Sequence, residues 1–112
     1  LRRDDQLDRL FRALADRTRR DIVGRVLSGE EVPVSALAAH YAMSFAAVQK
    51  HIAVLAEAGL VTKRPRGRER IVRANPRALA RARTLLAQLE QRWIDRFSQL
   101  DAILAEPTSP ME

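Results

Sequence analysis

The stretch from Pro76 to Leu104 constrains this chain most, because after its first residue it contains no glycine and no proline. Its apolar residues recur every three or four positions, which predicts one amphipathic helix. At 1.5 Å per residue that helix would be roughly 40 Å long, more than the rest of a small domain can cover. Part of its apolar face therefore needs another chain, and we expect a homodimer interface in its distal half. The residues expected there are Leu89, Trp93, Phe97, Leu100 and Leu104.

The whole chain is long enough for one domain with its own core but too short for two. We expect residues 1–105 to form that domain and residues 106–112 to be a disordered tail. The chain has no cysteine, which excludes disulfides and thiolate metal sites. It also has no apolar run near the roughly 20 residues that span a membrane, and no signal-peptide core at its start. We therefore expect a cytoplasmic protein with no membrane partner.

The first two thirds of the chain carry helix signals in four places. An amphipathic stripe predicts a helix over residues 4–15, and Asp16 is a suitable N-cap for a second helix. A short third helix is expected near residues 35–41. Ser44 is a suitable N-cap for a fourth helix over residues 45–58, and Gly59 suits its end. A short helix joined by a turn to a longer one fits helix-turn-helix geometry.

After Gly59 the pattern changes to two short β-prone pieces, Leu60-Val61-Thr62 and Ile71-Val72. Pro65 and Gly67 lie between them, so Arg64 to Gly67 is predicted to be a β-turn. So short a hairpin needs the helices for support, as the wing of a winged helix-turn-helix does. Asn75-Pro76 then signals the start of the last helix. The predicted fold is mainly α, with five helices and a small β-hairpin.

The positive charge of the chain is concentrated in its middle third. The net charge is +6, and residues 40–73 hold seven basic and two acidic residues. The segments 1–39 and 74–112 are almost neutral. Evenly spread surface charge would not leave two thirds of the chain neutral, so we expect an anion-binding face on the hairpin, with nucleic acid as the favoured partner.

Several motifs occur in an order that is specific to one family. They are Leu14-Ala15-Asp16-Arg17-Thr18-Arg19-Arg20-Asp21-Ile22, Leu37-Ala38, Ser44 to Leu55, Glu57-Ala58-Gly59-Leu60-Val61 and Arg66-Gly67-Arg68. Over about residues 7–75 the chain thereby resembles the ArsR/SmtB (arsenic-repressor-like) family of bacterial winged helix-turn-helix transcription regulators. The resemblance implies a homodimer formed by the first and last helices, which adds Leu7, Leu10 and Phe11 to the expected interface. It also implies operator binding by the fourth helix and the wing, usually with repression.

The sequence departs from this family in the residues that sense metals. The arsenic-type Cys-x-Cys pair of the third helix is absent, and His40 and His51 lie well before the last helix, where zinc-type ligands are found. We therefore expect no metal site and no cofactor. The inducer is unknown: a small organic molecule near the dimer interface, a partner protein, or no ligand at all are all compatible with the sequence.

The N-terminal half of the fourth helix is expected to enter the major groove of DNA. The contact residues expected there are Ser44, Phe45, Ala46, Gln49, Lys50 and His51. Gln49 suits adenine, Lys50 suits guanine or a phosphate, and Ser44 suits a phosphate. Phe45 either packs against Tyr41 or the helix-turn-helix core, or contacts a thymine methyl group.

The wing, residues 60–73, is expected on the flanking backbone or in the minor groove. Its contact residues are Lys63, Arg64, Arg66, Arg68 and Arg70, with Arg66 and Arg68 expected first because they lie at the tip. Arg17, Arg19 and Arg20 either add backbone contacts or pair with Asp16 and Asp21.

The predicted function is that of a dimeric repressor, associated with the nucleoid, that binds a pseudo-palindromic operator in double-stranded DNA. The alternative is a winged-helix interaction module whose basic wing binds an acidic partner protein. An enzyme is not expected, because the chain has no cysteine nucleophile, no glycine-rich phosphate loop and no His-Glu metal pair.

Overall fold

The structure is a computed structural model that describes residues 2–105. The expected tail, residues 106–112, lies outside the described residues. The chain divides into two compact units, Leu1–Ala82 and Arg83–Glu112. The described residues form α1 (Arg2–Leu14), α2 (Arg17–Val26), β1 (Val32–Pro33), α3 (Val34–Ala38), α4 (Phe45–Glu57), β2 (Val61–Arg66), β3 (Glu69–Ala74) and α5 (Pro76–Ala105). This order confirms the winged helix-turn-helix, with five helices.

The helix starts follow the capping residues that the sequence predicts. The Asp16 carboxylate accepts a hydrogen bond from the Arg19 backbone N–H at 3.0 Å, and the Ser44 hydroxyl accepts one from the Ala47 N–H at 3.1 Å. At the start of α5, Asn75 Oδ1 accepts from the Arg77 N–H at 3.2 Å. Each bond satisfies a backbone donor that the first turn of a helix leaves free.

Gly59 ends α4 with a φ of 79°. Its N–H donates to the Ala56 carbonyl, and the Leu60 N–H donates to the Leu55 carbonyl, which is the bond pattern of a Schellman motif. The buried Leu60 side chain accompanies this turn, so the chain leaves α4 and enters β2 in a fixed direction. Asn75 reinforces the corner, because its Nδ2 donates to the Gly59 carbonyl at 2.8 Å.

The sheet has three antiparallel strands in the order β1-β3-β2. Arg66 is paired with Glu69, so the hairpin turns at Gly67 and Arg68, and the predicted turn at residues 64–67 is wrong by two positions. Pro65 lies within β2, where its missing N–H is tolerated because β2 is an edge strand. Gly67 supplies the positive φ that a two-residue hairpin turn needs. Strand β1 was not predicted, because two residues carry no alternation pattern.

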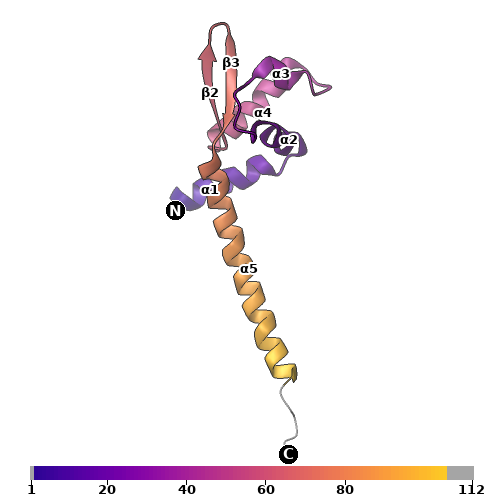
Figure 1. Cartoon of the computed structure of the whole chain (residues 1–112), viewed down its shortest axis with the longest axis vertical. Coiled ribbons are helices and arrows are strands. Elements are labelled where there is room, and N and C mark those ends of the chain that lie inside the picture. The colour runs from indigo at the N-terminus through magenta and orange to yellow at the C-terminus, as the bar shows by residue number, and fades with distance from the viewer. Residues whose placement is uncertain (1, 106–112) are drawn as a thin grey trace, which may run out of the picture. The chain divides into compact units, whose positions relative to one another are not determined.

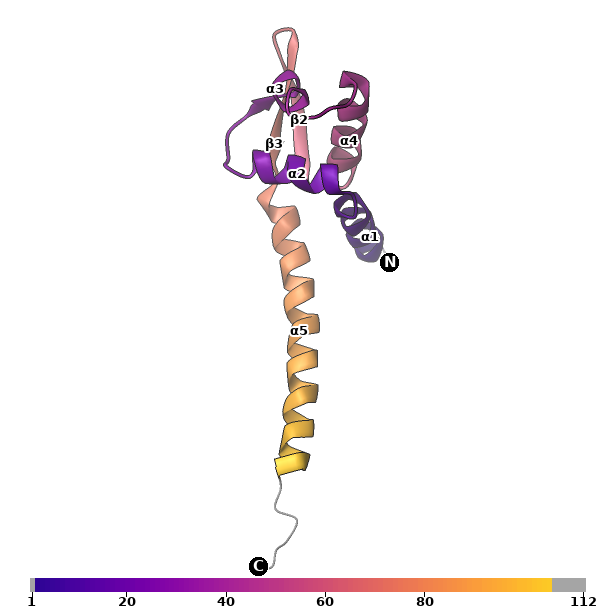
Figure 2. The same ribbon diagram turned by 90° about the vertical axis from the view of Figure 1, so that its right-hand side faces the viewer.

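The core lies in the first unit, where α1 to α4, the sheet and the first turns of α5 contribute buried side chains. Figures 1 and 2 show α3 and α4 on one side of the hairpin, whose turn extends beyond them, and α1 at the far end of the unit from that turn. Leu10 is 1% exposed in this core. It therefore offers no area to a partner, which corrects its expected place in the dimer interface. Leu7 and Phe11 are partly buried.

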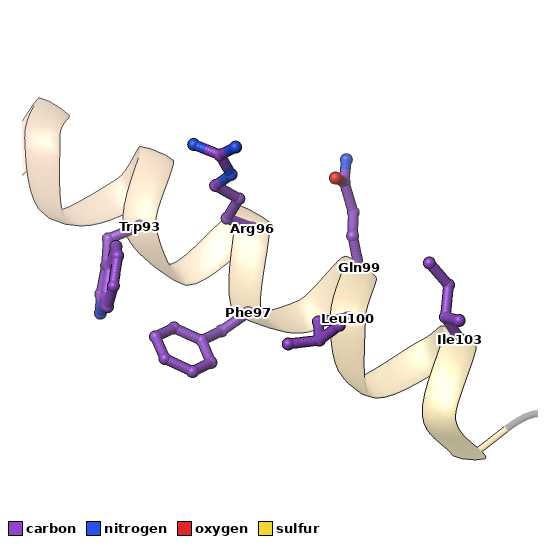
Figure 3. Close-up of a pocket in the computed structure, with 6 residues that line it drawn as sticks. All are labelled: Trp93, Arg96, Phe97, Gln99, Leu100 and Ile103. Carbon is purple, nitrogen blue, oxygen red and sulfur yellow. The ribbon is translucent and has the colours of Figure 1, made fainter.

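The second unit is described over residues 83–105 of α5, and none of these residues is buried. The exposure of its exposed large apolar side chains ranges from 45% for Ile94 to 72% for Leu104. Trp93 and Phe97 contact each other edge to face, with ring centroids 4.7 Å apart. Figure 3 shows both side chains and Leu100 pointing to the same side of the helix. No helix within residues 2–105 is both long enough and apolar enough to cross a membrane.

Candidate nucleic-acid interface

The turn that leads into α4 is held by a small polar cluster on α2. The Tyr41 hydroxyl donates to Asp21 Oδ2 at 2.6 Å, and Arg25 Nε donates to the same oxygen at 2.8 Å. The Arg25 guanidinium also lies 5.8 Å from the centre of the Tyr41 ring. Burial and the bond to Asp21 raise the pKa of Tyr41 to about 12, while these two partners lower the pKa of Asp21. These contacts fix the start of α4 against α2.

Helix α4 buries one face and exposes another. Val48, Ile52 and Leu55 are buried, whereas Ala46, Gln49 and Lys50 are exposed, as the sequence predicts. Phe45 is 49% exposed and does not belong to the core cluster, which removes the interpretation that it packs on the core. The exposed side chains at the start of α4 are therefore available to a ligand.

A groove of about 460 Å³ lies between α4 and the wing. Gln49 and Lys50 line it from α4, and Lys63 and Arg70 line it from the wing. The remaining lining residues are Val34, Ala46, Ile52 and Ala53. The sheet register explains why Lys63 and Arg70 both line the groove. Lys63 is opposite Val72, and Pro65, two residues further along β2, is opposite Arg70, so all four residues lie on one face. Opposed residues share one face of a sheet, and this face is the one that meets α4.

The opposite face of the wing carries Arg64 and Arg66. Arg64 donates from Nε and Nη2 to Glu31 Oε2, at 3.0 and 2.6 Å. Arg66 Nη1 is 3.8 Å from Glu31 Oε1. The hydrogen bonds from Arg64, with the nearby guanidinium charges, lower the pKa of Glu31. Two of the five wing cations expected to bind DNA are therefore already paired with a carboxylate.

The other three wing cations have no such partner. Within the part of the chain that the structure describes, Lys63, Arg68 and Arg70 have no carboxylate within ion-pair distance. All three side chains are exposed, and Arg68 lies in the hairpin turn. The sequence ranks Arg66 and Arg68 first because of the tip, whereas the geometry brings Lys63 and Arg70 together with the reading face of α4.

His51 does not lie on that face. Its side chain is 23% exposed, with Nδ1 3.4 Å from Arg19 Nη1 and 3.9 Å from Asp16 Oδ2. It therefore contacts the corner between α1 and α2, whereas the sequence places it in the DNA-binding set. The sequence could not show this, because the contact joins residues that are 32 positions apart.

Arg19 and Arg20 close the end of α1. Arg19 Nε and Nη2 donate to the carbonyls of Ala13 and Arg12, and Arg20 Nη1 donates to the carbonyl of Leu14. The last turn of a helix leaves such carbonyls free, and cationic side chains stabilise them. The sequence predicts either backbone contacts to DNA or pairing with Asp16 and Asp21 for these arginines, and in the structure both side chains cap the end of α1.

Within residues 2–105 no group of three or more His, Cys, Asp or Glu side chains lies close enough to hold an ion.

Comparisons with known proteins place this geometry among DNA-binding regulators. A family model described as a helix-turn-helix domain matches residues 14–64. The HTH-type transcriptional regulator Rv2034 of Mycobacterium tuberculosis (strain ATCC 25618 / H37Rv) is 41% identical over 93 residues, covering 83% of this chain and 86% of the relative.

Solved structures extend the similarity. The crystal structure of an ArsR family transcriptional regulator has 32% identity and a TM-score of 0.75, covering 80% of this chain and 92% of that one. The solution structure of the homodimeric winged helix-turn-helix DNA-binding domain of Mb0332 from Mycobacterium bovis has 26% identity and a TM-score of 0.62, covering 82% and 84%.

Proposed function

This chain belongs to the ArsR family of helix-turn-helix transcriptional regulators, and we propose that it acts as a dimeric repressor on a pseudo-palindromic operator. Membership makes it a DNA-binding transcriptional regulator and not an enzyme. The observation that carries the proposal is the groove of about 460 Å³ that α4 and the wing line together. Its amide and cationic side chains match the acceptor atoms of base edges and phosphates.

Helix α4 enters the major groove in this proposal. Gln49 pairs with an adenine and Lys50 reaches a guanine or a phosphate, because both side chains are exposed and border the groove. The Ser44 hydroxyl accepts from the Ala47 N–H, which leaves its own proton to donate to a phosphate. Phe45 and Ala46 present apolar surface beside them, which suits the methyl group of thymine.

In this proposal the wing contributes affinity through its positive charge rather than sequence specificity. Lys63 and Arg70 contact phosphates next to the helix, and Arg68 at the turn reaches the flanking backbone or the minor groove. These three cations are free of carboxylate partners among the described residues, so binding a phosphate breaks no ion pair. Arg64 and Arg66 contribute less, because Glu31 already contacts both.

The exposed apolar stripe of α5 forms the dimer interface. Leu89, Trp93, Phe97, Leu100 and Leu104 are each about half exposed or more, and water is an unfavourable surrounding for so many large apolar groups. We also assign Leu7 and Phe11 of α1 to the proposed set. The M. bovis domain to which this chain is similar is homodimeric. A two-fold dimer presents two copies of α4, which is why the operator is expected to be pseudo-palindromic.

Charge-removing and amide-removing variants test this assignment. Lys63→Gln with Arg70→Gln should weaken binding to any duplex and reduce the salt slope by roughly 0.9 for each lost phosphate contact. Gln49→Ala should instead reduce the preference for the operator over a scrambled duplex. Arg9→Gln is a control for the loss of a single positive charge outside the groove, because Arg9 is exposed on α1 at the far end of the unit. Fluorescence anisotropy measures all three.

The outcomes separate the proposal from its rival. If Lys63 and Arg70 can be neutralised with no more effect than Arg9, the groove does not bind DNA. A wild-type chain that binds an acidic protein but no duplex would instead support the interaction-module alternative.

A further inference from the structure

The five wing cations expected to bind DNA fall into two sets with different surroundings. Lys63 and Arg70 face the groove beside α4, and Arg68 lies in the turn. Arg64 and Arg66 lie on the other face of the hairpin and contact Glu31. The DNA-binding role of the wing uses the first set and leaves the second unexplained.

Glu31 is held in place by the sheet. It directly precedes β1, whose Val32 is paired with Val72 of the central strand β3. Arg64 is paired with Ile71 on the same strand, so the short first strand brings the carboxylate beside the arginines. The Glu31 side chain is only 25% exposed, whereas that of Arg64 is 62% exposed. The carboxylate is therefore the more buried partner, and the guanidinium is the more exposed one.

The contacts that Glu31 makes are those that a DNA phosphate would make. Arg64 uses two of its N–H groups on one carboxylate oxygen, and guanidinium N–H groups bind phosphate oxygens in the same way. A phosphate that binds these two N–H groups of Arg64 must displace Glu31, and the carboxylate repels a phosphate that approaches the remaining N–H groups.

We propose that Glu31 is a positioning residue that competes with DNA phosphates for Arg64 and Arg66 and so limits how many phosphates the wing neutralises. The inference rests on the proposed function, because it requires that the wing bind DNA. Its consequence is a repressor that is held less tightly by DNA of any sequence. The base-reading side chains of α4 take no part in this competition. They line the groove on one face of the wing, whereas Arg64 and Arg66 lie on the opposite face.

Glu31→Gln tests the proposal on a scrambled duplex, which isolates phosphate contacts from base contacts. The variant should bind about threefold to tenfold more tightly, and the salt slope should become steeper by roughly 0.9 for each arginine that is released. Glu30→Gln is the matched control, because it removes the same charge from the neighbouring exposed residue, which has no ion-pair partner among the described residues. It should leave the slope unchanged.

A second variant links the effect to Arg64. Arg64→Gln alone should change wild-type binding little, because Glu31 already occupies Arg64. In the Glu31→Gln background the same substitution should remove most of the gain. A purely structural role of Glu31 would lower the melting temperature and weaken binding without steepening the slope, and such a result would overturn the proposal. Thermal unfolding of each variant provides this readout.

The failure of this inference differs from the failure of the proposed function. If Lys63→Gln with Arg70→Gln weakens binding but Glu31→Gln leaves the slope at the wild-type value, the wing binds DNA and Glu31 does not compete. If neither the Lys63/Arg70 double variant nor Glu31→Gln changes the slope, the wing does not bind DNA, and both proposals are wrong.

Discussion

The two units of the chain differ in how far their large apolar side chains are buried. In the first unit, large side chains such as Ile22, Ile52 and Leu55 are buried by other elements of the same chain. In residues 83–105 of the second unit, side chains of the same size lie on one helix and none is buried. The sequence pattern is amphipathic in both units. The pattern alone therefore does not show whether the apolar face is covered by the same chain or by a second one.

The difference teaches that folding and association are separable in this protein. The first unit has a core that its own elements complete, and the exposed stripe of the second unit is completed by a second copy in our proposal. Burial of apolar area stabilises both, but only the second depends on protein concentration.

The largest expected effect is the loss of the dimer when charges are placed in the apolar stripe of the second unit. Trp93→Glu with Phe97→Glu places two carboxylates in the stripe, where burial of a charge is strongly unfavourable. We expect a monomer in sedimentation equilibrium at concentrations where the wild type is a dimer, with the circular dichroism of the first unit retained. Ser98→Glu with Ala102→Glu adds the same charge on the opposite side of the helix, by its 3.6-residue period, and should remain dimeric. A dimer for both double variants would contradict the interface.

The next largest effect is a loss of stability when a core side chain of the first unit is truncated. Leu55 is fully buried, so Leu55→Ala should lower the free energy of unfolding by about 2–5 kcal/mol at any protein concentration. Val54→Ala on the same helix removes a side chain that is partly exposed, and should cost less than about 1 kcal/mol. Urea unfolding of the full chain measures both. Equal losses for the two variants would show that α4 is not packed as described.

A smaller effect concerns the one exposed aromatic side chain at the start of α4. If Phe45 is exposed because its partner is DNA, replacing the contacted thymine by uracil should cost about 0.8 kcal/mol, roughly fourfold in affinity, since one buried methyl group is lost. Phe45→Ala should be insensitive to that replacement. The same uracil penalty for both proteins, measured by anisotropy, would rule out this contact.

The smallest effect is a titration within the first unit. The pKa of Tyr41 is about 12, so at pH 10.5 only a few per cent of this single tyrosine should be ionised, against roughly three quarters of an ordinary phenol. The raised pKa contributes stability that is complete below pH ~10 and is lost as pH rises toward ~12. Asp21→Asn should increase the phenolate absorbance at pH 10.5. An ordinary titration near pH 10 in the folded wild type would contradict the contact between Tyr41 and Asp21.

The sequence predicts local features of this fold well. The caps at Asp16 and Ser44 and the helix end at Gly59 depend on bonds between residues at most five positions apart. The reading face of α4 follows in the same way from the 3.6-residue period.

The sequence does not predict contacts that depend on tertiary placement. Glu31 and Arg64 are 33 positions apart and meet because β1 joins the sheet beside β3. His51 likewise meets Arg19 across the fold. A charged residue has no periodic signature that names its partner, so the division of the wing cations into paired and free sets required the structure. Leu10 shows the same limit, because an apolar stripe predicts burial but not which chain provides it.

The most direct test of the central claim is an anisotropy titration of the wild-type protein. It compares the DNA upstream of its own gene with a scrambled duplex of equal length, at about 50 and about 200 mM salt. We expect tighter binding to the upstream duplex, and on both duplexes an affinity that falls by about 10³–10⁵ across this range if roughly 6–10 phosphates are neutralised. Equal and weak binding to both duplexes, with little dependence on salt, would contradict the account.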